Sequence, residues 1–207
     1  MQAMPPGFRL VFLLAACAAL LALAASAGGG RPSQPGSWCG GPLWHLMTLS
    51  DGDRELVELT RTPNSIGTIA KLDAPAKIGL RRATDFQRHV WRLSAVVDRY
   101  RIASNGEIIL ILYSIDTGTY MNAYLENPHC LSARTRDRTG IEAARREFSA
   151  HCPMPTPAWQ LLGASADIAG VGFWNPSHVT RGALPNGAEL RPVTNFKIVS
   201  GCGVRST

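Results

Sequence analysis

The sequence has few of the short motifs that mark common catalytic and metal centres. Its 207 residues contain no H-E-x-x-H, no G-x-S-x-G and no C-x-x-C pair, so no zinc protease, serine hydrolase or zinc-finger site is indicated. The five histidines do not cluster in the sequence; they are His45, His89, His129, His151 and His178. Charged residues make up 17% of the chain, without a dense Lys/Arg run. Motifs alone therefore give no reaction class.

The first 27 residues have the pattern of a cleaved secretory signal. Arg9 precedes an apolar run over residues 10–24, and Ala25-Ser26-Ala27 is a small-residue cleavage site. The run is short for a spanning helix, so we favour cleavage over a retained membrane anchor. A lipoprotein signal is a second alternative, in which residues 14–17 would direct a lipid to Cys17. We expect a secreted or cell-envelope bacterial protein, monomeric and without a membrane span in the mature chain.

The mature chain has the length of one domain after a linker. Residues 28–42 are rich in Gly, Pro and Ser, which is typical of a linker, and residues 43–207 suit a single domain. Removing Arg9 with the signal lowers the formal charge from +6 to +5. A basic exported protein is compatible with binding a polyanion, such as nucleic acid or an anionic envelope glycan. Solubility alone also accounts for a charge of this size.

Four cysteines remain after the signal, an even number in an oxidising compartment. They are Cys39, Cys130, Cys152 and Cys202. Of the three pairings that four cysteines allow, we favour Cys130–Cys152 with Cys39–Cys202. The first would close the segment that holds a predicted helix, and the second would tie the start of the mature chain to its end. A zinc site is the alternative, but the spacing lacks the pairs that such sites use.

Apolar periodicity gives the order of the elements. The N-terminal part predicts a short strand over residues 43–49, a turn at 50–53 and a short helix within 64–72. Strands are then predicted over residues 89–103, 107–115 and 119–126, a helix over 140–152, and strands over 166–174 and 188–199. The helix has Ile141, Ala144 and Phe148 on one face. Pro192 indicates an edge or a bulge in the last strand.

Three meandering strands, a helix and two more strands follow the order of an OB-fold. The predicted fold class is therefore mainly β (α+β): a five-stranded OB-like barrel at about residues 88–200, with one helix between strands three and four, plus an N-terminal extension. Another mixed α+β sheet is the alternative.

Several segments together resemble a family of exported bacterial proteins of unassigned function. They are LWHLMTLSD (43–51), NGEIILIL (105–112), YMNAYLENPHC (120–130), GVGFW (170–174) and ALPNGAELRPV (183–193). The family has Asp-Gly-Asp-Ile-His-Leu-Val-Leu in its first hairpin, then Gly-Val-Gly-Phe-Phe, and closes with Ala-Pro-Asn-x-Ile-Glu-Leu-His-Pro-Val. The resemblance spans about residues 44–193, most of the mature chain.

This chain departs from the family pattern at polar positions. Asn105 stands where the family has one of its hairpin acids, Ile109 where it has the hairpin His, and Tyr124 where it has the Glu of strand three. Trp174-Asn175 replaces the family's Phe-Asp pair, and Arg191 replaces its closing His. If the family has a polar catalytic centre, this member has lost much of it.

The leading functional hypothesis is non-catalytic binding on the face of barrel strands two and three, where OB-folds hold oligonucleotides or oligosaccharides. Tyr120, Asn122 and Tyr124 share one face of the third strand, Tyr113 adds an aromatic from the second, and Arg92 lies on the first. In another register Arg99 and Arg101 face the same way. Aromatic rings provide stacking platforms and arginines provide phosphate contacts. His178 and Arg191 complete the candidate set, and packing under the N-terminal extension is the competing explanation.

Two other hypotheses remain. The barrel resembles that of thermonucleases, which use carboxylates to bind calcium; here Glu107 and Glu189 are the candidate ligands of a calcium-dependent phosphodiesterase. Only one acid, Glu107, remains at the hairpin position, which favours surface or turn carboxylates over a metal site. We therefore expect no cofactor, and Ca²⁺ only under this alternative. The third hypothesis is a protein–protein interaction module. We interpret residues 182–193 as the turn that leads into the last strand. Leu190 and Val193 would then point inward, and Glu189 and Arg191 would share the opposite face.

Overall fold

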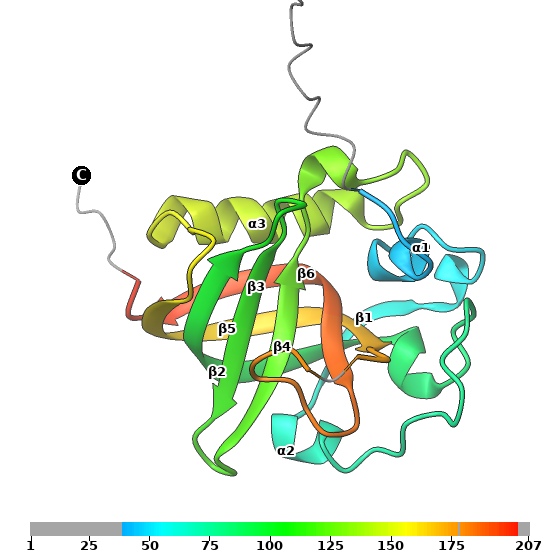
Figure 1. Cartoon of the computed structure of the whole chain (residues 1–207), viewed down its shortest axis with the longest axis horizontal. Helices are drawn as coiled ribbons and strands as arrows, with labels where there is room; N and C mark the ends of the chain where they lie inside the picture. Colours follow the sequence, from blue (N-terminus) through cyan, green and yellow to red (C-terminus); the bar gives the residue numbers. More distant parts are fainter. Residues whose placement is uncertain (1–38, 178, 203–207) are drawn as a thin grey trace, which may run out of the picture. The chain divides into compact units, whose positions relative to one another are not determined.

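Six strands form one sheet that closes on itself (Figure 1). The computed structural model describes residues 39–177 and 179–202, and these are mainly β, as the sequence predicts. The strands are β1 (Glu58–Pro63), β2 (His89–Ile102), β3 (Ile108–Ser114), β4 (Thr119–Leu125), β5 (Gln160–Trp174) and β6 (Ala188–Ser200). The helices are α1 (Trp44–Met47), α2 (Ile66–Ile69) and α3 (Arg138–His151), with short 3₁₀ turns at Arg54–Leu56, Asp85–Arg88 and Pro128–Cys130.

The sheet has the order β1-β2-β3-β4-β6-β5, and a further pairing of β2 with β5 closes the ring. Neighbouring strands are antiparallel except for β1 with β2 and β4 with β6, which are parallel. The α3 helix comes between β4 and β5 in the chain, where the pattern predicted it. It lies across one end of the ring, whereas α2 lies near the other end, beside the β3–β4 turn (Figure 1).

A bulge in β2 decides which arginines face outward. Leu93 and Val97 face the core at the expected even spacing, but the next buried residue is Tyr100. The pairing with both β3 and β5 shifts between Val97 and Arg99. The extra residue turns Arg99 and Arg101 to the outer face, because a bulge reverses the alternation of side chains beyond it.

The core lies inside the ring, and apolar side chains of α2 and α3 contribute to it. It includes Leu110 and Leu112 of β3, Ile168 of β5 and Phe148 of α3. Leu190 and Val193 of β6 also point into it, which confirms their predicted direction. At Arg191-Pro192 two residues of β6 stand opposite the single residue Val171, so Pro192 does mark a bulge. In the part of the chain that the structure describes, no helix has the length and apolarity needed to cross a membrane.

The N-terminal part differs from the prediction in two ways. The expected strand at 43–49 is the helical turn α1, because Met47 and Thr48 donate to the carbonyls of Leu43 and Trp44. A strand that the pattern did not predict, β1, runs parallel to the start of β2. Leu49 and Val57 from this part pack with Val90 and Val171 in a second, smaller apolar cluster.

Four cysteines form two disulfides, but the favoured pairing was wrong. The structure joins Cys39 to Cys130 and Cys152 to Cys202. The α3 helix packs along β6, so Cys152 at its C-terminal end lies beside the end of that strand. The same helix separates Cys130 from Cys152, since one cysteine precedes it and the other follows it. Cys130 is therefore left to pair with Cys39.

Candidate ligand-binding face

One outer face of β2, β3, β4 and β6 carries nearly all the polar residues that the sequence singled out. Strand register arranges them in rows across the sheet. Tyr113 and Tyr120 are directly opposite each other. The next row is Arg99, Ile111, Asn122 and Glu189, and the third is Arg101, Ile109, Tyr124 and Arg191. Glu107 and Glu126 follow in the fourth. The face runs from exposed tyrosines at one end to buried charges at the other.

The open end is an aromatic pair beside two arginines, and we call Tyr113, Tyr120, Arg99 and Arg181 the tyrosine–arginine face. The two rings have centroids 4.9 Å apart, and 43% of Tyr120 is exposed. A pocket of about 280 Å³ is lined by Asp98, Arg99, Ile111, Tyr120, Arg181 and Gly182. Asp98 Oδ2 lies 3.4 Å from Arg99 Nε, so the carboxylate partly compensates the charge of Arg99. Within residues 39–177 and 179–202, Arg181 has no ion-pair partner.

The wall of this pocket opposite the tyrosines comes from the β5–β6 connection. Gly182 has a positive φ of 78°, and its backbone lies directly on the sheet. A Cβ at this position would be 2.7 Å from the Ile111 side chain and 2.8 Å from Asn122 Oδ1. Glycine therefore brings the connection close enough to cover Asn122 fully and leaves Tyr120 open.

The closed end of the face is a buried ion cluster made by Arg191, Glu107 and Glu126. Arg191 donates through Nη2 to Glu107 and through Nε to Glu126, the latter at 3.1 Å. Its guanidinium carbon lies 4.2 Å from the centroid of the Tyr124 ring. These residues are 93% or more buried. A buried arginine of this kind fixes the ends of β3, β4 and β6 relative to one another.

The three carboxylates around Arg191 have different environments. Burial opposes ionisation of Glu107, but the Arg191 charge together with hydrogen bonds from Glu126, Asn105 and Arg191 holds the pKa of Glu107 below its ordinary value. Burial raises the pKa of Glu126 well above the ordinary value, despite Arg191. Burial also raises the pKa of Glu189, although Asn175 donates to its Oε1 at 2.8 Å and Tyr124 at 3.3 Å.

The structure thus separates the candidate residues into three groups. Tyr113 and Tyr120 lie together at the surface. Asn122, Tyr124 and Arg191 lie on the same face but are buried beneath its cover. Arg92 is exposed beside β1, seven residues along β2 from Arg99, or roughly 23 Å at the usual rise of a strand. His178 lies outside the described residues.

The candidate calcium ligands do not face one open site. Glu107 is bound by Arg191, whereas Glu189 is bound by Asn175 and Tyr124. Among the described residues, no group of three or more His, Cys, Asp or Glu side chains has the geometry to hold a metal ion. The acids of the 50–53 turn are likewise paired with arginines: Asp51 with buried Arg82 at 2.7 Å and Asp53 with Arg81 at 2.6 Å.

Sequence reasoning missed Glu126 and Arg181. Glu126 precedes Asn127-Pro128 and looks like a loop residue, and only the pairing of β3 with β4 shows that it lies beside Glu107. The even spacing of Tyr120, Asn122, Tyr124 and Glu126 was the available signal. Arg181 belongs to a connection without periodicity, so nothing local indicated its place.

No protein-family model matches the chain, and no curated protein matches it. Among solved structures, the chain is similar to an aspartyl-tRNA synthetase from Leishmania major Friedlin, with 11% identity, a TM-score of 0.39 and 73% of this chain covered. It is also similar to an asparaginyl-tRNA synthetase from Entamoeba histolytica, with 14% identity, a TM-score of 0.36 and 63% of this chain covered. The chain spans 23% and 25% of the length of these two proteins.

Proposed function

We propose that this chain is an exported, non-catalytic binding protein that holds an extended anionic polymer on the tyrosine–arginine face of an OB-like barrel. The observation that carries the proposal is the pair of half-buried Tyr113 and exposed Tyr120, with Arg99 and Arg181 around the adjoining pocket. The two rings are tilted by 39° to each other; an aromatic ring offers an apolar face on which a base or sugar can stack, and guanidinium groups bind phosphates and carboxylates.

The strand order supports the OB-like description. The ring β2-β3-β4-β6-β5 has a helix inserted between its third and fourth strands, and β3 and β4 correspond to strands two and three, whose face binds ligands in this fold. Arg181 and Gly182 of the β5–β6 connection border the same face, as the loop between the last two strands does in OB-folds. Two disulfides agree with an oxidising compartment outside the cytoplasm.

The buried ion cluster supports binding by making the floor of the face rigid. Its charges are paired and inaccessible, so they do not meet the ligand directly. A rigid platform loses less conformational entropy on binding than a mobile one. The exposed tyrosines and arginines then supply the contacts.

The experiment uses fluorescence anisotropy with two end-labelled probes, a single-stranded oligothymidylate of eight nucleotides and a hyaluronan hexasaccharide. We expect the mature chain to bind at least one probe, and Tyr120→Ala to weaken that binding by about 1–3 kcal/mol, the usual contribution of one stacking platform. Leu56→Ala, which removes an exposed apolar side chain elsewhere, is the matched control.

Three results would contradict the proposal. If neither probe binds, the chain is not a general polyanion binder and a protein partner becomes the better hypothesis. If Tyr120→Ala binds like the Leu56→Ala control, the ligand lies on another surface. If anisotropy falls below that of the free probe when Ca²⁺ is added, the chain cleaves its ligand.

A further inference from the structure

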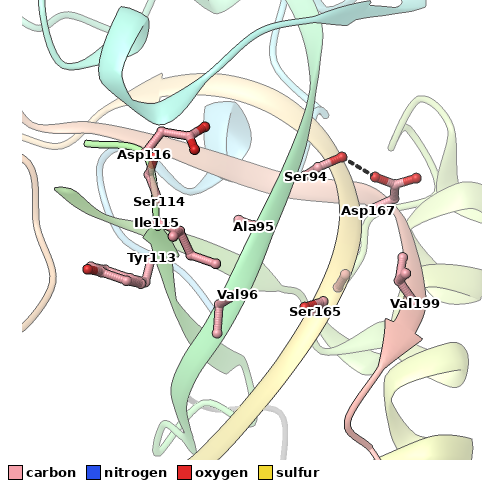
Figure 2. A pocket seen from close by; sticks show the side chains of 11 residues that line it. Ser94, Ala95, Val96, Tyr113, Ser114, Ile115, Asp116, Ser165, Asp167 and Val199 are labelled. Atoms are coloured by element: carbon pink, nitrogen blue, oxygen red, sulfur yellow. Dashed lines mark hydrogen bonds between the residues drawn. The ribbon is translucent and has the colours of Figure 1, made fainter. Parts of the chain in front are cut away.

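A second hollow adjoins the tyrosine–arginine face but has the opposite charge. We call it the sheet-gap groove. It has a volume of about 460 Å³ and shares Tyr113 with the tyrosine pair. Its other lining residues come from β2, the end of β3 and the turn after it, β5 and β6: Ser94, Ala95, Val96, Ser114, Ile115, Asp116, Ser165, Ala166, Asp167 and Val199. Figure 2 shows Ser94 and Asp167 on the β5 side and Asp116 on the β3 side.

The groove exists because β2 and β3 part from each other. Their pairing ends at Val96 with Tyr113, and the pairing of β1 with β2 ends at Arg92. Residues 93–95 of β2 therefore pair with β5 alone. The side chain of Ile115 points across the gap toward Val96 (Figure 2). This gap leaves an apolar floor between two polar walls.

The walls can accept hydrogen bonds from a ligand but repel anions. When ionised, Asp116 and Asp167 accept hydrogen bonds but cannot donate them. The three serine hydroxyls of the lining accept as well as donate; they belong to Ser94, Ser114 and Ser165. None of the lining residues is Lys, Arg or His; Lys197 stands opposite Asp167 on β6 but is outside the groove lining. Ser94 Oγ donates to Asp167 Oδ1 at 2.5 Å, which orients that carboxylate. A ligand in this groove must be rich in donors and carry no negative charge there.

We propose that the sheet-gap groove holds the hydroxyl groups of a neutral sugar, and that the polymer on the tyrosine–arginine face is a glycan in which neutral sugars separate the charged ones. This inference rests on the proposed function, since the two hollows meet at the Tyr113–Tyr120 pair. A sugar ring offers hydroxyl donors to Asp116 and Asp167 and C–H groups to Ile115 and Val96. A nucleic acid has a phosphate on every residue, so a strand crossing both hollows would bring one beside these carboxylates.

The test compares the two labelled probes on the mature chain and on a variant that combines Ser94→Ala, Asp116→Ala and Asp167→Ala. Hyaluronan has a neutral sugar between successive charged ones, as the groove requires. We expect wild type to bind the hexasaccharide more tightly than the oligothymidylate, and the triple variant to weaken hexasaccharide binding by roughly tenfold, because several hydrogen bonds are lost. Oligothymidylate binding should stay unchanged or become tighter, because two negative charges are removed. Asp73→Ala, an exposed carboxylate outside both hollows, is the matched control.

The failures of the two proposals are distinguishable. If only the oligothymidylate binds, or if the triple variant binds the hexasaccharide as well as the Asp73→Ala control does, the groove does not hold a sugar and the glycan assignment is wrong. The proposed function would survive either result. If neither probe binds, the proposed function itself fails. The circular dichroism spectrum of each variant shows whether a loss of binding reflects a loss of fold, and the conservative variant Asp167→Asn, which keeps an acceptor oxygen, should retain most of the affinity.

Discussion

Tyr124 and Arg191 lie side by side on the parallel strands β4 and β6, and the guanidinium carbon of Arg191 is 4.2 Å from the centre of the Tyr124 ring. The same guanidinium binds Glu107 and Glu126. Four residues away along β4, beyond Asn122, Tyr120 reaches the surface. The stability of the cluster and the shape of the binding face are therefore linked through one strand.

Replacing Arg191 with Met should lower the free energy of unfolding by about 3–5 kcal/mol, because two buried carboxylates lose their counter-charge. Urea denaturation of the variant measures this change. The triple variant with Glu107→Gln and Glu126→Gln should recover part of the loss, since no uncompensated charge remains. A loss below 1 kcal/mol for Arg191→Met would mean that the cluster contributes little.

The Glu126→Gln variant should change how stability depends on pH. Burial raises the pKa of Glu126 in the folded state above its unfolded value, so the native chain binds more protons, and Glu126 lowers stability as pH rises through that interval. Glu107 has the opposite sign: its lowered pKa adds stability that is lost as pH falls. We expect Glu126→Gln to lessen the decline that begins as pH rises above 4.5, the ordinary pKa of a glutamate, and to leave the part that comes from Glu189, whose pKa is also raised. Urea denaturation at a series of pH values measures this, and an unchanged decline would contradict the assignment.

Peptide mapping without reduction should recover Cys39 linked to Cys130 and Cys152 linked to Cys202. Replacing both Cys152 and Cys202 with Ser should cost about 4 kcal/mol, because the bridge spans 50 residues and limits the unfolded chain. Thermal denaturation of the double variant gives the cost. A fragment that links Cys130 to Cys152 would show the structure's pairing to be incorrect.

Gly182→Ala should move the β5–β6 connection away from Ile111 and Asn122. The added Cβ would clash with both side chains, and the positive φ costs about 1–2 kcal/mol for an alanine. We expect a small loss of stability together with weaker binding of whichever probe the wild type holds, because Arg181 moves with the connection. Anisotropy and urea denaturation measure the two effects, and unchanged binding would show that Arg181 does not contact the ligand.

Much of the sheet could be predicted because local chemistry decides it. The strands over 89–103, 107–115 and 119–126 alternate and are separated by turn residues, and the helix before Cys152 has a regular apolar face. The α1 turn could not be predicted in this way, since the mixed apolar and polar pattern of residues 43–49 fits a short strand or a helical turn equally well. Unlike the central strands, β1 is mostly exposed and has little apolar alternation to reveal it.

The site was only partly accessible to sequence reasoning because it depends on register between distant strands. Alternation placed Tyr120, Asn122 and Tyr124 on one face, but it could not show that Gly182 lies against Asn122 or that Arg191 lies over the Tyr124 ring. The bulge after Val97 decided that Arg99 faces outward, and a bulge leaves no reliable local signal. Arg92 was a candidate by strand alternation, yet it lies near β1 instead.

The most direct test of the binding claim is the salt dependence of hyaluronan hexasaccharide affinity for three proteins: wild type, the Arg99→Ala/Arg181→Ala variant and Arg92→Ala. A plot of log Kd against log salt concentration reports how many charge contacts the complex makes. We predict weaker binding and a slope that is shallower by roughly one to two for the double variant, at about one for each arginine contact, with Arg92→Ala unchanged. Equal slopes for wild type and the double variant would contradict binding on the tyrosine–arginine face. So would an effect of Arg92→Ala as large as that of the double variant.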